Sequence, residues 1–355
     1  MKSILRKFLP QKNIVKLKSV VSAFDEKIYP FFAKNSLLSS IYYCFFSTQF
    51  RREHQAVLKG RVQYQASLNA IEQSSVLLRR NTHRLEKGLI MQPRRDVFAQ
   101  AYIAETVDCF CKCMVSSTIC SDELKWAQDV LVSYFDIVGP DAVIDQAKQR
   151  FQSQNLKRFD TEADSLPYQH DERVQSDISS LELAALFKQR RSVRWYEQKP
   201  VDQTLIAQAI EMASQAPSAC NRQPFQFYTI TDMDKASEIA AIAMGTTGFS
   251  DNIPALLVVV GDLSAYPAER DRHVIYIDGG LASMQLMLAF ETMGLSSCPI
   301  NWPDIEICER KIAKKLNLPK HLRPIMLMSV GFGQATGKIP FSQKKNATIL
   351  MKEVN

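Results

Sequence analysis

A chain of 355 residues, 46% apolar and 23% charged, is long enough for two domains and has the composition of an ordinary soluble globular protein. It shows no internal repeat or low-complexity tract, which excludes repeat and fibrous architectures. The net charge of +7 is uneven: residues 1–62 hold twelve Lys or Arg and three acidic residues, a balance of +9. The positive charge therefore belongs to the N-terminal part, and we expect no nucleic-acid partner.

Eight cysteines raise the question of a metal site or disulfides. Cys109, Cys111 and Cys113 alternate along a predicted helix, so their side chains point in different directions and do not form a metal-binding knuckle. We therefore expect no metal. The chain shows no secretory signal and no paired cysteine framework, which favours reduced thiols and a cytoplasmic location.

The first fifty residues are basic and aromatic. Residues 1–22 mix Lys and Arg with apolar side chains, as a basic amphipathic segment does. Residues 35–50 are uncharged and aromatic-rich, but sixteen residues interrupted by Ser and Thr are too short and too polar for a transmembrane helix. Three alternatives remain for residues 1–50: peripheral contact with a membrane, contact with a partner, or packing on the protein's own domain.

Residues 1–159 are predicted to form an all-α N-terminal region, followed by an acidic linker over residues 160–176. Within the region, helical patterns cover roughly residues 56–80, 97–117, 121–137 and 140–154. The segment from Asn81 to Leu89 lies between the first two, and Gly88 and Pro93 are expected to end the helical pattern there. Four charged or titratable residues should then gather near a turn: His83, Arg84, Glu86 and Lys87. This corner is either solvated surface or a site for a substrate or partner.

Residues 177–355 mix helical and strand patterns, which predicts an α+β fold with a central sheet flanked by helices. Helices are expected over residues 178–188, 201–215 and 273–293, and strands over residues 225–231, 255–262 and 325–330. The helix over residues 273–293 is apolar on most of its circumference, so it must be buried either in a core or at a subunit interface.

Two polar clusters flank the helix over residues 201–215. The first contains Arg190, Arg191, Ser192 and Arg194, a dense set of donors that suits a phosphate or another compact anion. The second, residues 216–225, offers amide and hydroxyl groups that suit the edge of a planar polar ring. From the residues alone, the clusters are either solvated surface or a site for a phosphorylated heteroaromatic cofactor.

The two clusters read R-R-S-x-R-x-Y and, some twenty residues later, A-P-S-x-x-N-x-Q-P-F. This pair resembles the opening signature of the nitroreductase family of FMN-dependent, homodimeric oxidoreductases. The resemblance covers residues 178–355 and implies a nitroreductase-like fold with a long helix at the dimer interface. It also implies hydride transfer from NADH or NADPH through FMN to a small-molecule acceptor.

The resemblance also implies roles for single residues. Arg190, Arg191 and Ser192 would bind the ribityl-phosphate end of FMN, and Arg194 would lie near N1 and O2 of the ring, where a cation stabilises the reduced flavin. From the partner subunit, three residues would reach the flavin: Pro217, Ser218 and Asn221. On the segment from Gly294 to Asn301, which resembles a family loop, Pro299 and Ile300 would line the ring and the Asn301 backbone N–H would point at N5.

Departures from the family pattern leave three positions open. Trp302 either narrows the pocket or stacks on the substrate, or else is buried in the core. Cys298 is either a nucleophile or, as we expect, a packing residue. The C-terminal phosphate ligand is one or two of Lys338, Lys344 and Lys345, since the lysines are displaced from the usual places.

The string H-R-L-E-K-G-L, which begins at His83, resembles one found upstream of the nitroreductase domain in a subgroup associated with bacterial surface-polysaccharide loci. A further possibility among enzymes is dehydrogenation or flavin-dependent modification of a sugar or lipid-linked intermediate, instead of reduction of a nitro group. The alternative function is an accessory or scaffold protein of such a pathway, with a non-catalytic flavin-type dimer fold.

Overall fold

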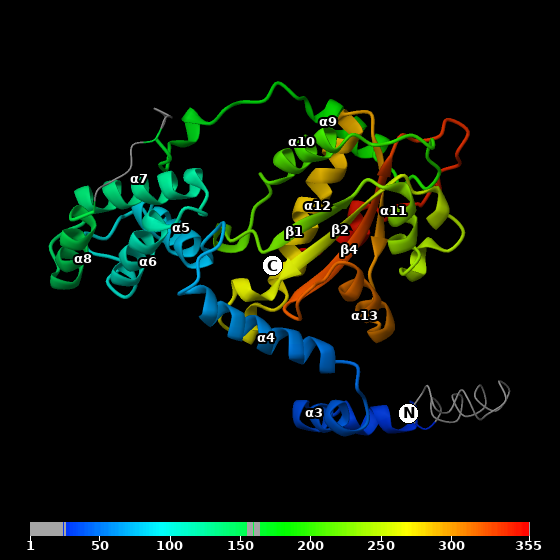
Figure 1. Ribbon diagram of the computed structural model, residues 1–355, viewed down its shortest axis with the longest axis horizontal. Helices are drawn as coiled ribbons and strands as arrows, with labels where there is room; N and C mark the ends of the chain where they lie inside the picture. Colours follow the sequence, from blue (N-terminus) through cyan, green and yellow to red (C-terminus); the bar gives the residue numbers. More distant parts are fainter. Residues whose placement is uncertain (1–23, 25, 155–158, 160–163, 355) are drawn as a thin grey trace. The chain divides into compact units, whose positions relative to one another are not determined.

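The computed structural model describes residue 24, residues 26–154, residue 159 and residues 164–354 (Figure 1). These form two compact units, Met1–Gln55 and Ala56–Asn355. The basic segment 1–22 and the first residues of the expected linker lie outside the described residues.

The first unit contains helix α3, Ser36–Phe45, whose N-terminus is capped by the side chain of Asn35. The ring of Tyr42 is its most buried large side chain, and it contacts the rings of Tyr29, Phe32 and Phe46. The remaining aromatic and aliphatic side chains of this unit are largely exposed. Helix α4, Arg51–Ser67, begins in this unit and continues into the second.

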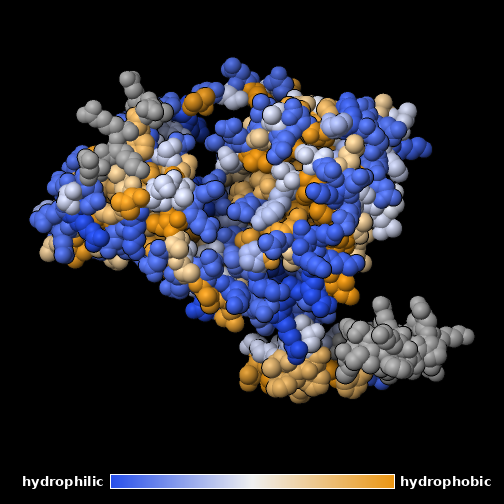
Figure 2. Space-filling view, viewed as in Figure 1, coloured by the Kyte–Doolittle hydropathy of each residue, from blue (hydrophilic) through white to orange (hydrophobic). Residues whose placement is uncertain are grey.

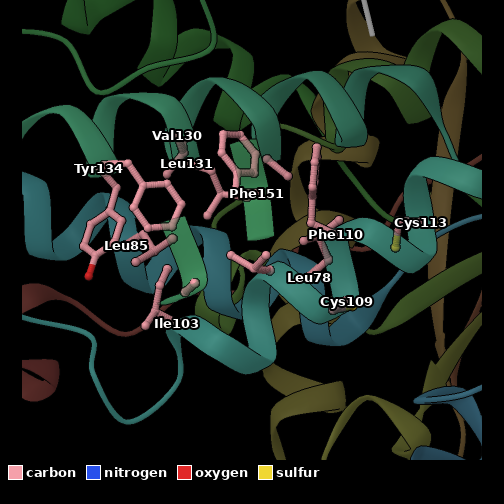
Figure 3. Close-up of a cluster of buried hydrophobic side chains, with 14 of the residues drawn as sticks. Leu78, Leu85, Ile103, Cys109, Phe110, Cys113, Val130, Leu131, Tyr134 and Phe151 are labelled. Carbon is pink, nitrogen blue, oxygen red and sulfur yellow. The ribbon is translucent and has the colours of Figure 1, made fainter. Parts of the chain in front are cut away.

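The helical part of the second unit has one apolar core (Figure 3). After α4, it is built from α5 Val76–Leu89, α6 Ile103–Val115, α7 Ser121–Ile137 and α8 Ala142–Gln152. Side chains on the inner faces of the last four helices point toward one another, among them Leu78, Leu85, Phe110, Tyr134 and Phe151. Burial of these faces is what keeps the short helices folded.

Two expectations for this part are corrected. The single helix expected over residues 56–80 is two helices, because the chain turns after Ser67 and the Ser75 side chain caps a new helix, accepting from Leu78 N at 3.2 Å. The expected turn around His83 is also wrong, since these residues lie inside α5. The helix does end where expected, at Leu89, one residue after Gly88. A Cβ on Gly88 would lie 2.2 Å from Phe98, so this glycine also makes room for that ring.

The sheet is antiparallel throughout, in the order β1-β2-β4-β3. Its strands are β1 Phe225–Ile230, β2 Ala255–Asp262, β3 Ser296–Asn301 and β4 Leu322–Gly331. The three predicted strands correspond to β1, β2 and β4, and β2 is interior and buried as expected. The segment expected to be a loop is the edge strand β3, which tolerates Pro299 because an edge residue can do without a ladder N–H.

Helices cover both faces of this sheet (Figure 1). Helices α10, Gln203–Ala213, and α12, Val274–Thr292, pack on one face, and α11, Met233–Ala240, with α13, Glu306–Lys315, on the other. Helix α9, Ser180–Gln189, starts with a capping box between Ser179 and Glu182 and has no buried residue. The C-terminal segment ends with the short α14, Ala347–Leu350.

Helix α12 divides its apolar surface between the core and the outside. Gly279 faces the sheet, where a Cβ would lie 2.7 Å from the Ile325 side chain, so glycine permits the close approach of helix and strand. On the opposite side Ile277 is 58% and Leu281 44% exposed. Within the described chain, Glu269–Thr292 is the one helical segment long and apolar enough to cross a membrane, and half of its apolar window is buried.

Candidate active site

The arginine-rich segment Arg190–Tyr196 runs along the outer edge of the sheet. Val193 N donates to the carbonyl of Ser297 in β3 at 3.1 Å, and Ser192 pairs with Ser297 in a parallel bridge. The tyrosine of the R-R-S-x-R-x-Y pattern anchors the segment: Tyr196 is 2% exposed, and its hydroxyl donates to Val193 O at 2.7 Å. The sheet thereby brings the arginines next to β3.

Each arginine of the segment has a different environment. Arg190 Nε is buried and has no hydrogen-bond partner among the described residues. Arg194 donates to the carbonyl of Ser192 at 3.3 Å, which folds its guanidinium back over the strand. Arg191 donates to the carbonyls of Pro340 and Phe341. The C-terminal segment is therefore held beside the arginines, with the exposed Lys338 and Lys344 on either side of the contact.

Along β3, the backbone N–H and C=O groups point alternately toward β4 and toward the outer edge of the sheet. The side chains of Cys298 and Ile300 are buried in a core cluster, so Ile300 faces the core within one chain. Since the Ser297 carbonyl points to the outer edge, the two-residue repeat directs the Asn301 backbone N–H to that same edge. Pro299, between them, has no N–H to leave unpaired.

The burial of Trp302 and Cys298 decides between the alternatives left open for these two residues. Trp302 is 8% exposed and donates its indole N–H to Glu309 at 2.6 Å, so its ring belongs to the core. Burial raises the pKa of the Cys298 thiol, although the charge of Arg194 partly opposes this. A buried, neutral thiol packs and is a poor nucleophile.

The second polar cluster forms a loop fixed by one buried carboxylate. Asp278 in α12 accepts from Ser218 Oγ at 2.7 Å and from Ala219 N at 2.9 Å, and Ser218 Oγ in turn accepts from Gln223 N. The Ser218 hydroxyl is therefore engaged within its own chain. By contrast, the side-chain amide of Asn221 makes no hydrogen bond among the described residues. The D-G-G string at Asp278 was visible in the sequence, but its link to Ser218 was not.

One chain does not bring the two polar clusters together. The loop is held at Asp278, whereas Gln189, which precedes the arginines, donates to Glu291 at 3.4 Å. Asp278 and Glu291 lie thirteen residues apart on α12, which corresponds to about 20 Å along the helix. Arg190–Arg194, β3 and the C-terminal segment thus lie together at one location, and Pro217–Asn221 lies at another.

The donor set fits a phosphorylated planar cofactor. Arg190 Nε and Ser297 Oγ are buried polar atoms without partners among the described residues, and such groups call for an external acceptor or donor. Guanidinium groups bind phosphate oxygens, and an edge N–H can meet a ring nitrogen. In the described parts of the chain, no three His, Cys, Asp or Glu side chains converge as metal ligands do.

The fold defines a class: an α+β protein whose antiparallel sheet is covered by helices on both faces, preceded by an all-helical region. Residues 187–250 and 245–332 match the family model described as Nitroreductase family. This part of the chain is a nitroreductase-family domain, and the family expectation from the sequence is confirmed.

Known proteins cover the same half of the chain. YdgI of Bacillus subtilis, named as an NAD(P)H nitroreductase, is 28% identical over 191 residues, which covers 43% of this chain and 90% of YdgI. The FMN reductase [NAD(P)H] of B. subtilis is 28% identical over 156 residues, covering 40% of this chain and 61% of that protein. A nitroreductase-family structure from Streptococcus pneumoniae is 22% identical, has a TM-score of 0.42, and covers 48% of this chain and all of its own.

Glu291 predicts how stability depends on pH. Burial raises its pKa above the ordinary value of 4.5, and the hydrogen bond from Gln189 and the charge of Arg190 only partly oppose this. Above pH 4.5 the folded protein therefore binds a proton that the unfolded chain has lost, so stability falls as pH rises through the raised pKa. Glu291→Gln should remove this part of the decline, measured by urea unfolding at several pH values between 4 and 7. Glu211→Gln, at an exposed position, is the control, and equal slopes for Glu291→Gln and wild type would contradict the prediction.

Proposed function

We propose that the protein is an FMN-dependent oxidoreductase that passes hydride from NADH or NADPH through the flavin to a small-molecule acceptor. An NAD(P)H-dependent flavin oxidoreductase is what the family domain and its relatives support. The observation that carries the proposal is the pairing of Arg190–Arg194 with the outer edge of β3, next to unpartnered buried donors.

The residues of this half-site have distinct tasks. Bound FMN would supply the hydride chemistry. Arg190 and Arg191, with Lys338 or Lys344, would hold its phosphate. Arg194 would offset negative charge on the reduced ring, and the Asn301 N–H at the strand edge would orient the reactive ring nitrogen. No side-chain acid or base is assigned, so the protein would act by orientation, by tuning the cofactor's potential and by excluding water.

The cofactor test uses the purified full-length chain. Wild-type protein should show a flavin spectrum that NADH or NADPH bleaches without oxygen. Arg194→Ala should slow this reduction by roughly 10²-fold, the scale found when a preorganised charge-stabilising group is removed. The control is Arg310→Ala, whose side chain is exposed and pairs with Glu306 in the same helix. Protein that stays colourless after FMN is added would contradict the proposal. An Arg194→Ala variant that keeps its biological function would favour the alternative of a scaffold protein.

We further propose a homodimer that completes the site. The exposed side of α12 carries Ile277, Leu281 and Met284, and Gly280 between them has no atom within 4 Å of its Cβ position. Such an apolar stripe with a small residue suits close packing against a second helix. If two copies of α12 run antiparallel about a two-fold axis, the Asp278 end of one lies at the Glu291 end of the other. Pro217, Ser218 and Asn221 would then face the arginines of the partner.

The dimer is tested by placing a charge in this stripe. Leu281→Glu should give a monomer in sedimentation velocity, because the carboxylate would be buried without a partner. The same variant should lose FMN affinity, since half of the site would be missing. Val143→Glu, at a 45% exposed position on α8, should leave both unchanged. A wild-type monomer that binds FMN fully would refute the shared site.

Peripheral membrane contact is proposed for the first unit. Three of its side chains are highly exposed: Leu37 at 70%, Phe45 at 75% and Phe46 at 56%. Figure 2 shows the apolar side chains gathered over α3. The unit Met1–Gln55 contains ten Lys or Arg and three acidic residues, a net charge of +7. Exposed aromatic side chains with positive charge suit an anionic lipid surface.

The membrane test compares vesicles of phosphatidylcholine alone with vesicles that also contain phosphatidylserine. Wild-type protein should co-sediment with the anionic vesicles and be released by salt. Replacing Phe45 and Phe46 together by Ser should reduce the bound fraction several-fold, whereas Val115→Ser, at an 86% exposed position on α6, should not. Equal binding by wild type and the double variant would exclude contact through α3.

A further inference from the structure

Helix α5 contacts the loop that carries Asn221 through one arginine. Arg79 Nε donates to the backbone carbonyl of Asn221 at 2.9 Å, and Arg79 Nη2 donates to the side-chain oxygen of Gln223 at 3.0 Å. These bonds join residues 142 and 144 positions apart in the chain. The guanidinium therefore binds the loop at two points, the backbone carbonyl of Asn221 and the side chain of Gln223.

The Arg79 side chain is itself held in place by Glu123 of α7. Its Nη1 donates to Glu123 at 3.1 Å, and the Glu123 side chain is 2% exposed. Glu123 also accepts from Ser74 Oγ at 2.6 Å and from Ser75 N at 2.8 Å, so every carboxylate oxygen is used. A planar guanidinium with fixed partners on three nitrogens has little freedom to turn.

The loop needs such support. Cys220, Asn221 and Gln223 adopt φ angles of 52°, 49° and 50°, the left-handed region that residues other than glycine seldom occupy. Three such residues within four positions persist only where surrounding contacts over-determine them. Asp278 holds the start of the loop from α12, and Arg79 holds its end from α5.

A second contact fixes the helical part to the sheet part nearby. Ala56 and Val57 of α4 pack in an apolar cluster with Leu263 and Tyr266. A Cβ on Gly60 would lie 2.7 Å from the Leu263 carbonyl oxygen, so α4 lies directly against this backbone. Helix α4 is therefore docked on the segment that follows β2, while α5 contacts the end of the loop through Arg79.

We propose that Arg79 is a positioning residue of the flavin site. By holding the backbone of Asn221, it keeps the side-chain amide of that residue free and directed for the cofactor of the partner subunit. The helical region 56–154 is then a structural component of the active site. This inference rests on the proposed function, because it assumes that FMN meets the Pro217–Asn221 loop.

The test compares two adjacent arginines. Arg79→Ala should raise the FMN dissociation constant at least tenfold and change the visible circular dichroism of the bound flavin, which reports its asymmetric surroundings. Arg80→Ala is the matched control, because Arg80 bonds to Tyr64, Asn81 and Glu105 and makes no contact with the loop. Its FMN dissociation constant should stay within twofold of wild type. Far-ultraviolet dichroism and sedimentation of both variants should match wild type.

A loop-side variant keeps the test valid if Arg79→Ala unfolds. Gln223→Leu removes one of the two Arg79 contacts, together with the bond that the Gln223 amide donates to the Ser214 carbonyl at 2.9 Å, and leaves α5 untouched. It should therefore shift the flavin dichroism in the same direction as Arg79→Ala. Wild-type binding of FMN together with unchanged affinity and dichroism in Arg79→Ala and Gln223→Leu would overturn this inference alone. An equal loss in Arg80→Ala would also overturn it, since the effect would then be general destabilisation. Wild-type protein that binds no FMN overturns the proposed function and this inference with it.

Discussion

The pairing of the Arg190–Tyr196 segment with the edge of β3 is the interaction on which the candidate site depends. Three guanidinium groups within five residues repel one another and would stay in water if their backbone were free. The bond from Val193 to Ser297 and the buried hydroxyl of Tyr196 fix that backbone. The charges are thus concentrated at a sheet edge where a backbone N–H also points outward. This is the arrangement from which the proposed cofactor site is built.

Helix α12 sets the spacing of everything else. Its inner side packs on the sheet through Gly279, and its two ends hold the loop at Asp278 and the arginine segment near Glu291. Because an α-helix is stiff, the two polar clusters stay about 20 Å apart within one chain. A helix that separates two half-sites and also exposes an apolar stripe favours an assembly of two chains, in which each half meets its complement.

Much of the sheet part could be predicted from the sequence, for clear physical reasons. The apolar runs of β2 and β4 are buried on both faces, and the apolar period of α10 matches its packing face. Strand β3 was missed because the segment was assigned to a loop from the family resemblance, and Pro299 gives no local sign of an edge strand. The start of helix α5 was misread because residues 68–75, where the chain turns, contain no Gly or Pro, so the helical pattern was extended to residue 80.

The connections between these elements could not be read from the sequence at all. The bonds of Arg79 to Asn221 and Gln223, and of Asp278 to Ser218, join residues far apart in the chain, and no local pattern marks them. The R-R-S-x-R-x-Y pattern identified the family and the cofactor class. It gave no sign that Tyr196 anchors the segment or that Arg191 binds backbone carbonyls of the C-terminal segment.

The hydrogen bonds from Arg79 to a loop with positive φ angles constrain how the sequence of this protein can evolve. Substitutions in α5 or α7 that displace the Arg79 guanidinium by a fraction of a hydrogen-bond length would change the backbone of the loop. The loop residues themselves would remain unchanged. Substitutions in the helical region and in the loop at Asn221 are therefore expected to accumulate together. In a chimaera that joins the sheet part of this chain to a different helical region, the backbone carbonyl of Asn221 would lose its hydrogen bond from Arg79.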